Sequence, residues 1–509
     1  MADDAVCETE LKFEIEAKAV RALRRHPALA APGETAKLHS TYFDTPRHDL
    51  RKQGLTLRVR QSGDSYVQTV KQKRPSAGFG RDEWESGIAG AEPDPDVFRA
   101  TPVGIALNGQ AASLAPVFAT DVTRTTRMWT QGGNVVEISL DEGRITADGT
   151  HEPIRELELE LKAGDPGALF TLARDLAGAG TMRLSFESKG ERGYRLVGHD
   201  LAALKADNDV VTADMTAAEA FRAVARSCLA QIAGNARLLR RVRSPQALHQ
   251  TRVGLRRLRA ALATFKPLLE GAGEADQDLT RVEAESKWLA GELDAARDLD
   301  VFVDTSFRPA EAAAPEDPAL AAFGERLLHA QADAYDRAIA ALESPRYALL
   351  LLETAAWVEV GGWAGRTAAG DQGVAAFAAG SLKRLLKRVK ARGHHLAAQA
   401  PEERHHLRIQ AKKLRYATEM FAEVFGKGAG KRRRRFVVAL KALQDRLGEL
   451  NDIAVARETA LRAAGGHSPE LAFTAGLLVG RRAHDAPALV AAAAEAFDRL
   501  SDAKRFWKG

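Results

Sequence analysis

The chain has 509 residues, of which 45% are apolar and 28% charged, and its formal net charge is +5. This length exceeds what one hydrophobic core usually serves, so we expect two or more domains. The composition excludes a disordered or collagen-like chain, and two cysteines are too few for a disulfide framework. The N-terminus has no basic, apolar leader and no stretch is apolar enough for a membrane span, so we expect a cytoplasmic protein without a membrane partner.

Residues 5–200 show a pattern of mostly period two. Short helices also fit at Ala19–Arg25 and Ala168–Ala177. Alternation of apolar and polar side chains is typical of strands with two unlike faces. It is clearest in Leu55–Arg60, Val135–Leu140 and Glu156–Leu161. We therefore predict a β-rich first domain.

The pattern changes after a polar, acidic linker at residues 201–215. Thr216, with a glutamate three residues later, has the signature of a capping box. Ser244 and Ser344 are each followed by proline, as expected at a helix start. Alanine and leucine then recur at helical spacing, so we expect an all-helical domain over residues 216–507.

One helical segment occurs twice in this second domain. When His249–Phe265 is placed over His405–Phe421, six of the seventeen positions are identical. A chance overlay should give about one identity, so duplication is the better explanation.

Each copy carries a basic face beside an apolar stripe. At about 100° per residue, a histidine and three cations of each copy share one side of the helix. They are His249, Arg252, Arg256 and Arg259 in the first copy, and His405, Arg408, Lys412 and Arg415 in the second. No acid occurs in residues 252–269 or 404–418, and two further basic runs without acids lie at Lys383–His395 and Lys431–Arg435. Such charges repel one another without a counter-anion, and arginine and lysine suit phosphate oxygens.

The sequence favours a bare phosphate chain over DNA or RNA as this anion. Nucleic-acid modules usually add aromatic stacking platforms, whereas only Tyr416 lies in the repeated helices before their final phenylalanine. We therefore do not expect nucleic acid as a partner. The histidines could gain charge beside an anion, which would tighten binding at lower pH.

The helical half resembles the CHAD domain over about residues 216–507. The paired helices carry the resemblance together with Arg297-Asp298-Leu299-Asp300-Val301, Ser344-x-Arg346-Tyr347 and Leu447-Gly-Glu-Leu-Asn451-Asp452. The resemblance implies two pseudo-symmetric helical bundles with a basic groove that binds inorganic polyphosphate. Lys412 and Lys413 replace arginines of the first copy, which keeps the charge but loses the bidentate fork.

Several strands of the first domain have one wholly charged face. If they closed into an antiparallel β-barrel with these faces inward, the lumen would be polar. Clustered carboxylates there would repel by roughly 4 kcal/mol per close pair at an effective dielectric of about 20, which a divalent cation would relieve. Oxygen ligands favour Mg²⁺ or Mn²⁺, and a metal with cations around an elongated anion suits phosphoryl transfer. The charged positions are Glu8, Glu10, Lys12, Arg58, Arg60, Lys71, Lys73, Glu83, Glu85, Glu156, Glu158, Glu160 and Lys162.

This half resembles the CYTH, or triphosphate tunnel, domain over about residues 5–197. Its opening signature is Glu8-x-Glu10-x-Lys12, which Glu14-Ile-Glu16-Ala-Lys18 also fits. We prefer the first register because an aromatic residue follows its lysine and it opens the domain. The other matching motifs are Tyr42-Phe-Asp44-Thr-Pro46, Leu57-Arg-Val-Arg60, Thr69-Val-Lys71, the Glu156/Glu158/Glu160 strand and Ser188-Lys189-Gly-Glu-Arg-Gly-Tyr-Arg195.

The resemblance implies roles for individual residues. Glu8, Glu10 and Lys12 would be catalytic. The metal ligands would be Glu8, Glu10, Asp141, Glu156 and Glu158, holding Mg²⁺ or Mn²⁺. The triphosphate would be bound by Arg58, Arg60, Lys71, Lys73, Arg124 and Lys189. Two alternatives stay open: Arg127 follows Arg124 on the same strand with opposite parity, and Glu137 shares the parity of Asp141.

The fusion of the two domains resembles bacterial inorganic triphosphatases. It implies hydrolysis of tripolyphosphate to pyrophosphate and phosphate in the cytoplasm. A location on polyphosphate granules would be compatible with this function. The alternatives are an adenylate cyclase of class IV type, a thiamine triphosphatase, or a non-catalytic protein that anchors to polyphosphate granules.

Overall fold

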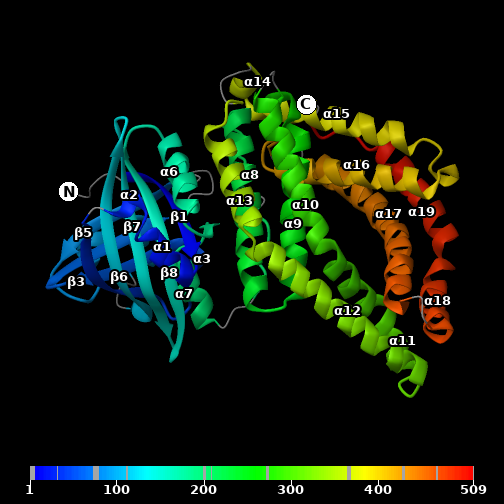
Figure 1. The fold of residues 1–509 in the computed structure, drawn as a ribbon. Coiled ribbons are helices and arrows are strands. Elements are labelled where there is room, and N and C mark those ends of the chain that lie inside the picture. Colours follow the sequence, from blue (N-terminus) through cyan, green and yellow to red (C-terminus); the bar gives the residue numbers. More distant parts are fainter. Residues whose placement is uncertain are drawn as a thin grey trace. The chain divides into compact units, whose positions relative to one another are not determined.

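The computed structural model divides the chain into two compact units (Figure 1). The first comprises Met1–Ala203 with Ser344–Val360, and the second comprises Leu204–Glu343 with Gly361–Gly509. The structure describes residues 6–30, 32–72, 80–109, 113–198, 202–207, 209–270, 274–363, 368–426, 430–465 and 468–507. The expected order of strands followed by helices is confirmed.

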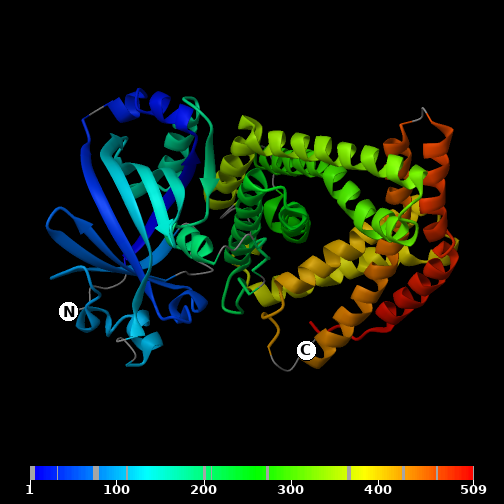
Figure 2. The same cartoon turned by 90° about the horizontal axis from the view of Figure 1, so that it is seen from below.

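Nine strands form one antiparallel sheet in the first unit, in the order β5-β4-β3-β2-β6-β7-β8-β1-β9. Their bounds are β1 Val6–Ile15, β2 Glu34–Asp44, β3 Leu55–Ser62, β4 Ser65–Gln72, β5 Gly80–Ile88, β6 Ala115–Gln131, β7 Asn134–Ala147, β8 Thr150–Ala163 and β9 Met182–Ser185. Strand β5, at one end of this order, also pairs with β1, from Val6↔Glu83 to Thr9↔Gly80. This pairing requires a strongly curved sheet, and Figure 2 shows the strands bending away from a plane.

The alternation in the sequence places unlike side chains on the two faces of this sheet. Between β1 and β8, the pairs Leu11↔Leu159 and Phe13↔Leu157 alternate with the charged pair Lys12↔Glu158. The four apolar residues are fully buried. Helix α6 (Gly167–Ala177) contacts β7 and β8 with an apolar face, so the charged face is left to line a site.

Short helices complete the first unit, together with one long helix from the middle of the helical half. The short ones are α1 Ala17–Leu23, α2 Pro27–Ala30, α3 Asp49–Lys52, α4 Pro95–Phe98, α5 Pro102–Leu107 and α7 Lys189–Val197. The long one is α13 (Pro345–Val360), which contacts β9 and α6. Arg174 of α6 pairs with Glu353 of α13 through two contacts of 2.7 and 3.0 Å.

The second unit is helical. Its helices are α8 Ala217–Arg241, α9 Pro245–Leu269, α10 Glu274–Phe302, α11 Arg308–Ala313, α12 Pro318–Glu343, α14 Ala368–Asp371, α15 Val374–Gly393, α16 Pro401–Met420, α17 Gly430–Ala464, α18 Pro469–Ala483 and α19 Ala486–Asp502. A π-helical turn at Val303–Phe307 and a 3-10 turn at Leu396–Ala398 complete the set. No helix in the described part of the chain combines the length and apolar character needed to cross a membrane.

The expected helix starts and the repeat are both visible. Thr216 and Glu219 form the predicted capping box of α8. Ser244 accepts a hydrogen bond from the amide of Ala247, so α9 also begins as predicted. The repeated segments are α9 and α16, which pack against each other. Their aligned phenylalanines, Phe265 and Phe421, lie with ring centroids 5.7 Å apart, so equivalent positions of the two copies meet in the core.

Candidate active site

The charged face of the sheet surrounds a cavity of about 490 Å³. Among the described residues of its lining, Leu55 is the one aliphatic side chain. The lining comprises Glu10, Lys12, Tyr42, Arg51, Gly54, Leu55, Thr56, Arg58, Arg60, Lys71, Gln72, Glu83, Glu85, Arg124, Glu137, Glu158, Glu160, Lys162, Ser188, Lys189, Gly190, Glu191 and Tyr194. Cations and carboxylates therefore meet here in a confined space.

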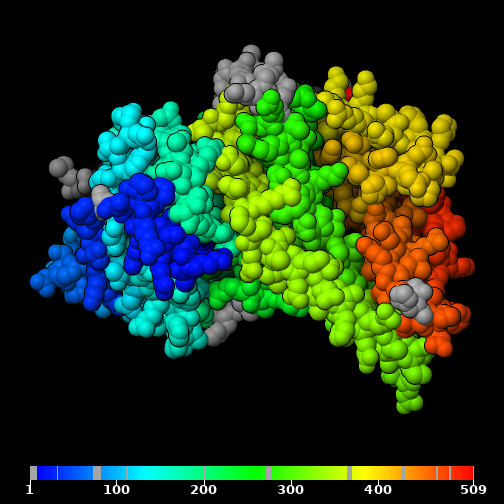
Figure 3. Space-filling model, viewed as in Figure 1, coloured from blue at the N-terminus to red at the C-terminus, as the bar shows by residue number. Residues whose placement is uncertain are grey.

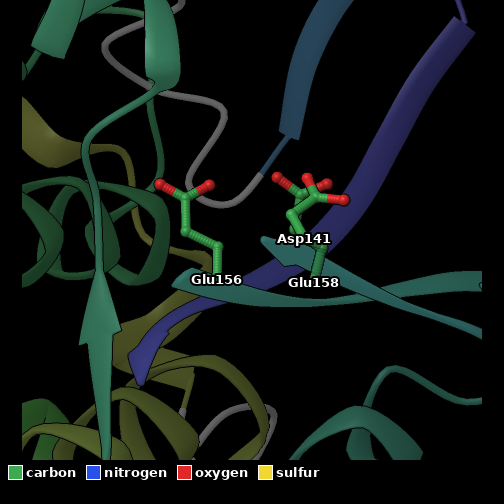
Figure 4. Close-up of side chains that lie close together, drawn as sticks. All are labelled: Asp141, Glu156 and Glu158. Atoms are coloured by element: carbon green, nitrogen blue, oxygen red, sulfur yellow. The ribbon is translucent and has the colours of Figure 1, made fainter. Parts of the chain in front are cut away.

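Three buried carboxylates gather on one side of the site (Figure 4). Asp141 comes from β7 and pairs in register with Glu156 of β8, while Glu158 lies two residues further along β8. Residues two apart in a strand point to the same face, so adjacent strands bring all three together. One oxygen of each lies within 4.8 Å of the others.

Lys189 sits among these carboxylates because it is the first residue of α7. Its Nζ lies 2.8 Å from Asp141, 2.5 Å from Glu156 and 2.9 Å from Glu158. A capping box between Ser188 and Glu191 fixes the start of the helix. Burial lowers the pKa of Lys189, but the three carboxylates outweigh it and raise the pKa well above its usual value. The ammonium is therefore held charged.

The helix also approaches the sheet closely through a glycine. A Cβ at Gly193 would come within 2.1 Å of the Phe118 ring. No side chain fits there unless α7 or the Phe118 ring moves. Gly193 thus keeps Lys189 at the level of the carboxylates.

Two more cations contact Glu158. Arg124 binds Asp141 through two contacts of 2.7 Å and reaches Glu158 at 2.5 Å. The Nζ of Lys12 lies 3.1 Å from Glu158 and 3.6 Å from Glu10. Burial raises the pKa of Glu158, but Lys12, Lys189 and Arg124 together hold it well below its usual value.

Arg192 of α7 is a buried residue of the site that sequence reasoning missed. Its Nε donates to Glu152 at 2.8 Å, and its guanidinium also binds Glu156 and the carbonyl of Pro153. It therefore links α7 to the strand that carries two of the carboxylates. The capping box of Ser188, four residues earlier, fixes the start of the helix and was the one available signal.

The opposite side of the cavity is basic. Arg58 donates to Thr69 at 2.9 Å and lies 3.3 Å from Glu85, and Lys71 lies 2.5 Å from Glu83. The charge of Arg58, followed by burial and the charge of Arg124, lowers the pKa of Arg60 to about 10. Unlike Arg58 and Lys71, Arg60 has no ion pair within the described part of the chain. Glu83 and Glu85, seen only as a charged strand face in the sequence, are the counter-ions of this wall.

The structure brings most of the predicted residues to the cavity. Glu10 and Lys12 line it, whereas Lys18 of the alternative register is 82% exposed. Arg124 lines the cavity and contacts Asp141 and Glu158, whereas Arg127 is not part of the lining. Glu137 lines the cavity beside Lys162. Lys73 and the side chain of Glu8 lie outside the described residues, so their predicted roles stay predictions.

The carboxylate cluster fits a metal ion. Asp141, Glu156 and Glu158 offer only oxygen atoms, are buried, and lie close enough together to share one ion. Carboxylate oxygens are the ligands of hard divalent cations. Lys189 contacts the same three carboxylates.

The basic faces of α9 and α16 meet in the second unit. Arg256 lies 3.4 Å from the hydroxyl of Tyr416. Burial, then Arg408 and Arg256, lowers the pKa of Lys412 to about 7. We call His249, Arg252, Arg256, Arg408 and Lys412 the α9–α16 cluster.

Arg297 of α10, named in the sequence only within a motif, adds a charge to this cluster. Burial, then Arg297, Arg256 and Arg252, lowers the pKa of His249 to about 4. His249 is therefore neutral near pH 7.

The other predicted members lie around this cluster. Arg415 pairs with Glu419 at 3.0 Å, and the Nδ1 of His405 lies 3.0 Å from the side-chain oxygen of Asn451. Arg259 is exposed and its charge acts on Lys413. The two helices thus bring positive charge together from both copies of the repeat.

Comparison with known proteins agrees with both resemblances. Residues 7–194 match the CYTH domain, and residues 223–461 match the CHAD domain. The chain therefore contains a CYTH domain followed by a CHAD domain.

Individual relatives cover parts of the chain. An inorganic triphosphatase of Haemophilus influenzae is 32% identical over 168 residues, which are 31% of this chain and 46% of that protein. The match thus spans less than half of this curated relative. The crystal structure of the CHAD domain from the plant Ricinus communis is 27% identical with a TM-score of 0.50, covering 58% of this chain and 96% of that one. PptA from Streptomyces chartreusis is 18% identical with a TM-score of 0.43, covering 56% and 100%.

Proposed function

We propose that the protein hydrolyses inorganic tripolyphosphate to pyrophosphate and phosphate with Mg²⁺ or Mn²⁺, and that its helical unit binds inorganic polyphosphate. One observation carries the proposal: one polar cavity is lined both by the cations Arg58, Arg60 and Lys71 and by Glu158, which belongs to a buried triad of carboxylates. That pairing suits an elongated anion with a bound metal ion. We further propose that the curved sheet surrounds this anion.

Each side of the cavity has its own task in this proposal. Arg58, Arg60 and Lys71 would bind the phosphate oxygens. Arg60 would gain the most electrostatic stabilisation from a phosphate because it has no carboxylate partner among the described residues. Asp141, Glu156 and Glu158, with Glu10 and Glu8, would hold the metal. A divalent cation held there would supply charge neutralisation and Lewis-acid activation. Lys12, Lys189 and Arg124, which contact the carboxylates, would steady the phosphoryl group between the two walls.

The cavity lining favours an inorganic triphosphate over a nucleotide or thiamine triphosphate. Binding sites for organic groups are usually lined mostly by apolar and aromatic side chains. Here the described lining holds one aliphatic side chain, Leu55, and two tyrosines. The hydroxyl of Tyr194 is already bound to Asp44, and Tyr42 is stacked on Phe118.

Polyphosphate binding rests on the α9–α16 cluster. Burial first, and then the repulsion of neighbouring cations, lowers the pKa values of Lys412 and His249. A phosphate chain would relieve that repulsion at several side chains together. A non-catalytic anchoring protein would use the same cluster, so activity of the first unit decides between the two functions.

The test is turnover of purified protein with tripolyphosphate, ATP or thiamine triphosphate, each with Mg²⁺ or Mn²⁺. We expect phosphate release with tripolyphosphate as the preferred substrate. Glu158→Gln should abolish release without weakening polyphosphate binding, whereas Glu34→Gln, an exposed glutamate at the start of β2, should change neither. Formation of cyclic AMP would instead establish a cyclase, and no release from any triphosphate would leave only the anchoring function.

A further inference from the structure

A second basic surface lies on α15, apart from the α9–α16 cluster. The inner side of this helix is apolar and buried. Four of its cations, Lys383, Lys387, Arg388 and Arg392, are exposed, and at about 100° per residue they extend over half of its circumference. We call these four residues the α15 face. In Figure 3 the surface of α15 (yellow) is open to solvent.

Two further cations of the same helix, which are half-buried, already have partners. Arg384 donates to the carbonyl of Thr264 at 2.8 Å, and Lys390 donates to the carbonyl of Ser501 at 2.7 Å. By contrast, none of the four residues of the α15 face has an acidic partner within 4.0 Å in the described part of the chain. Ordinary solvated helix faces mix acids and bases to form stabilising pairs, so this face is unusual.

The α15 face is continuous with positive charge on the neighbouring helices. Burial, then Arg259 of α9 and Arg388, lowers the pKa of Lys413 on α16, while Glu283 and Lys266 act more weakly and in opposite directions. Lys413 directly follows Lys412 of the α9–α16 cluster. Arg259 and Lys413 therefore bridge the two basic surfaces.

The face is long enough to follow a chain-like anion. Lys383 and Arg392 are nine residues apart, which is about 14 Å along the helix axis, and they point to opposite sides of the helix. A single small anion cannot contact both of them. A polymer that leaves the α9–α16 cluster can do so.

We propose that the α15 face is a second contact surface for polyphosphate, used only by chains long enough to extend beyond the α9–α16 cluster. The proposal rests on the proposed polyphosphate binding of the helical unit. It favours polyphosphate over nucleic acid because the one aromatic residue of α15, Phe377, is buried, so the face offers no stacking platform.

The test compares short oligophosphate with long-chain polyphosphate on the full-length protein. The triple variant Lys383→Gln/Lys387→Gln/Arg392→Gln should bind the short chain as the unchanged protein does. It should bind the long chain about tenfold more weakly at moderate salt, and the salt dependence of long-chain binding should fall by roughly two in log–log slope. Glutamine keeps helix propensity, and thermal unfolding checks that the fold is intact.

A matched control removes three exposed cations elsewhere on the same unit. Arg281→Gln/Arg326→Gln/Arg337→Gln changes the net charge equally, on α10 and α12, and should leave long-chain binding unaltered. Equal long-chain affinity of the two triple variants would overturn the proposal, as would tighter binding of a single-stranded oligonucleotide than of polyphosphate. If the unchanged protein binds no polyphosphate of any length, the proposed function of the helical unit fails as well.

Discussion

Arg192 occupies a position in which one side chain controls a carboxylate of the proposed metal site. It is buried and binds Glu152, Glu156 and the carbonyl of Pro153. Residues that orient metal ligands typically change metal affinity or activity by about 10–100-fold when they are lost. We therefore expect the loss of Arg192 to change the metal concentration that activity requires, rather than the affinity for substrate.

We predict that Arg192→Gln raises the Mg²⁺ concentration needed for half-maximal triphosphatase activity by about tenfold or more. Glu156 would lose its fixed orientation, while the basic wall would be unaffected, so the KM for tripolyphosphate at saturating metal should change little. Arg155→Gln, on the same strand but exposed, is the control. A loss of kcat that no metal concentration restores would contradict the positioning role.

Lys412 gives the α9–α16 cluster a pH dependence near neutrality. Its pKa in the folded protein is lowered to about 7 by burial, Arg408 and Arg256, with Asp452 acting in the opposite direction. A phosphate chain favours the charged ammonium, so binding above this pKa requires proton uptake. His249 does not serve this purpose as the sequence suggested, because its pKa is about 4 and it stays neutral near pH 7.

We predict that polyphosphate affinity falls by up to about tenfold per pH unit above pH 7 and levels off below it. Lys412→Arg should remove this pH dependence because arginine stays charged. Lys287→Arg, at an exposed position of α10, should retain it. Titration calorimetry in buffers of different ionisation enthalpy would also detect the proton uptake, and its absence would contradict the assignment.

At the scale of elements, two capping boxes allow the effect of a helix cap on stability to be measured separately from its effect on catalysis. Ser188 caps α7 beside the cavity, and Thr216 caps α8 in the helical unit. Replacing such a cap by alanine costs about 1 kcal/mol. Only the first cap sets the place of a residue of the site, Lys189.

We predict that Ser188→Ala and Thr216→Ala each lower the free energy of unfolding of their own unit by about 1 kcal/mol. Only Ser188→Ala should also lower kcat for tripolyphosphate. Urea unfolding and steady-state kinetics measure the two effects. Equal kinetics of both variants would show that the capping box does not position Lys189.

Local patterns predicted these elements well because their causes are local. The capping box at Thr216 and the alternation of Glu156–Leu161 in β8 lie within a few residues of sequence, whereas the capping box at Ser188 and the strand pairing Asp141↔Glu156 were not predicted. Arg192 was not predictable, because its partners Glu152 and Glu156 are about forty residues away, in a strand whose distance from α7 no pattern encodes. The lowered pKa of Lys412 depends in the same way on packing between helices that are far apart in sequence.

At the scale of the whole molecule, the first unit is discontinuous. Helix α13 comes from the middle of the helical half, yet it groups with the sheet and contacts β9 and α6. Ten of its sixteen residues are buried, as expected of a helix that is covered on most sides. Strand β9 ends four residues before Lys189. Contacts that stabilise β9 therefore also stabilise the position of Lys189 in the site.

We predict that residues 1–203 alone lose triphosphatase activity at a lower urea concentration than the full chain, because β9 and α6 lose their contacts with α13. A chain in which a flexible Gly/Ser linker joins Ala203 to Ser344 and which ends at Val360 should regain most of the difference. Arg174→Ala in the full chain should cost only about 0.5 kcal/mol, since its pair with Glu353 is partly exposed. The linked chain separates loss of α13 from loss of the helical unit. If it were no more stable than residues 1–203, α13 would not be part of the catalytic unit, and the sheet would be stable without it.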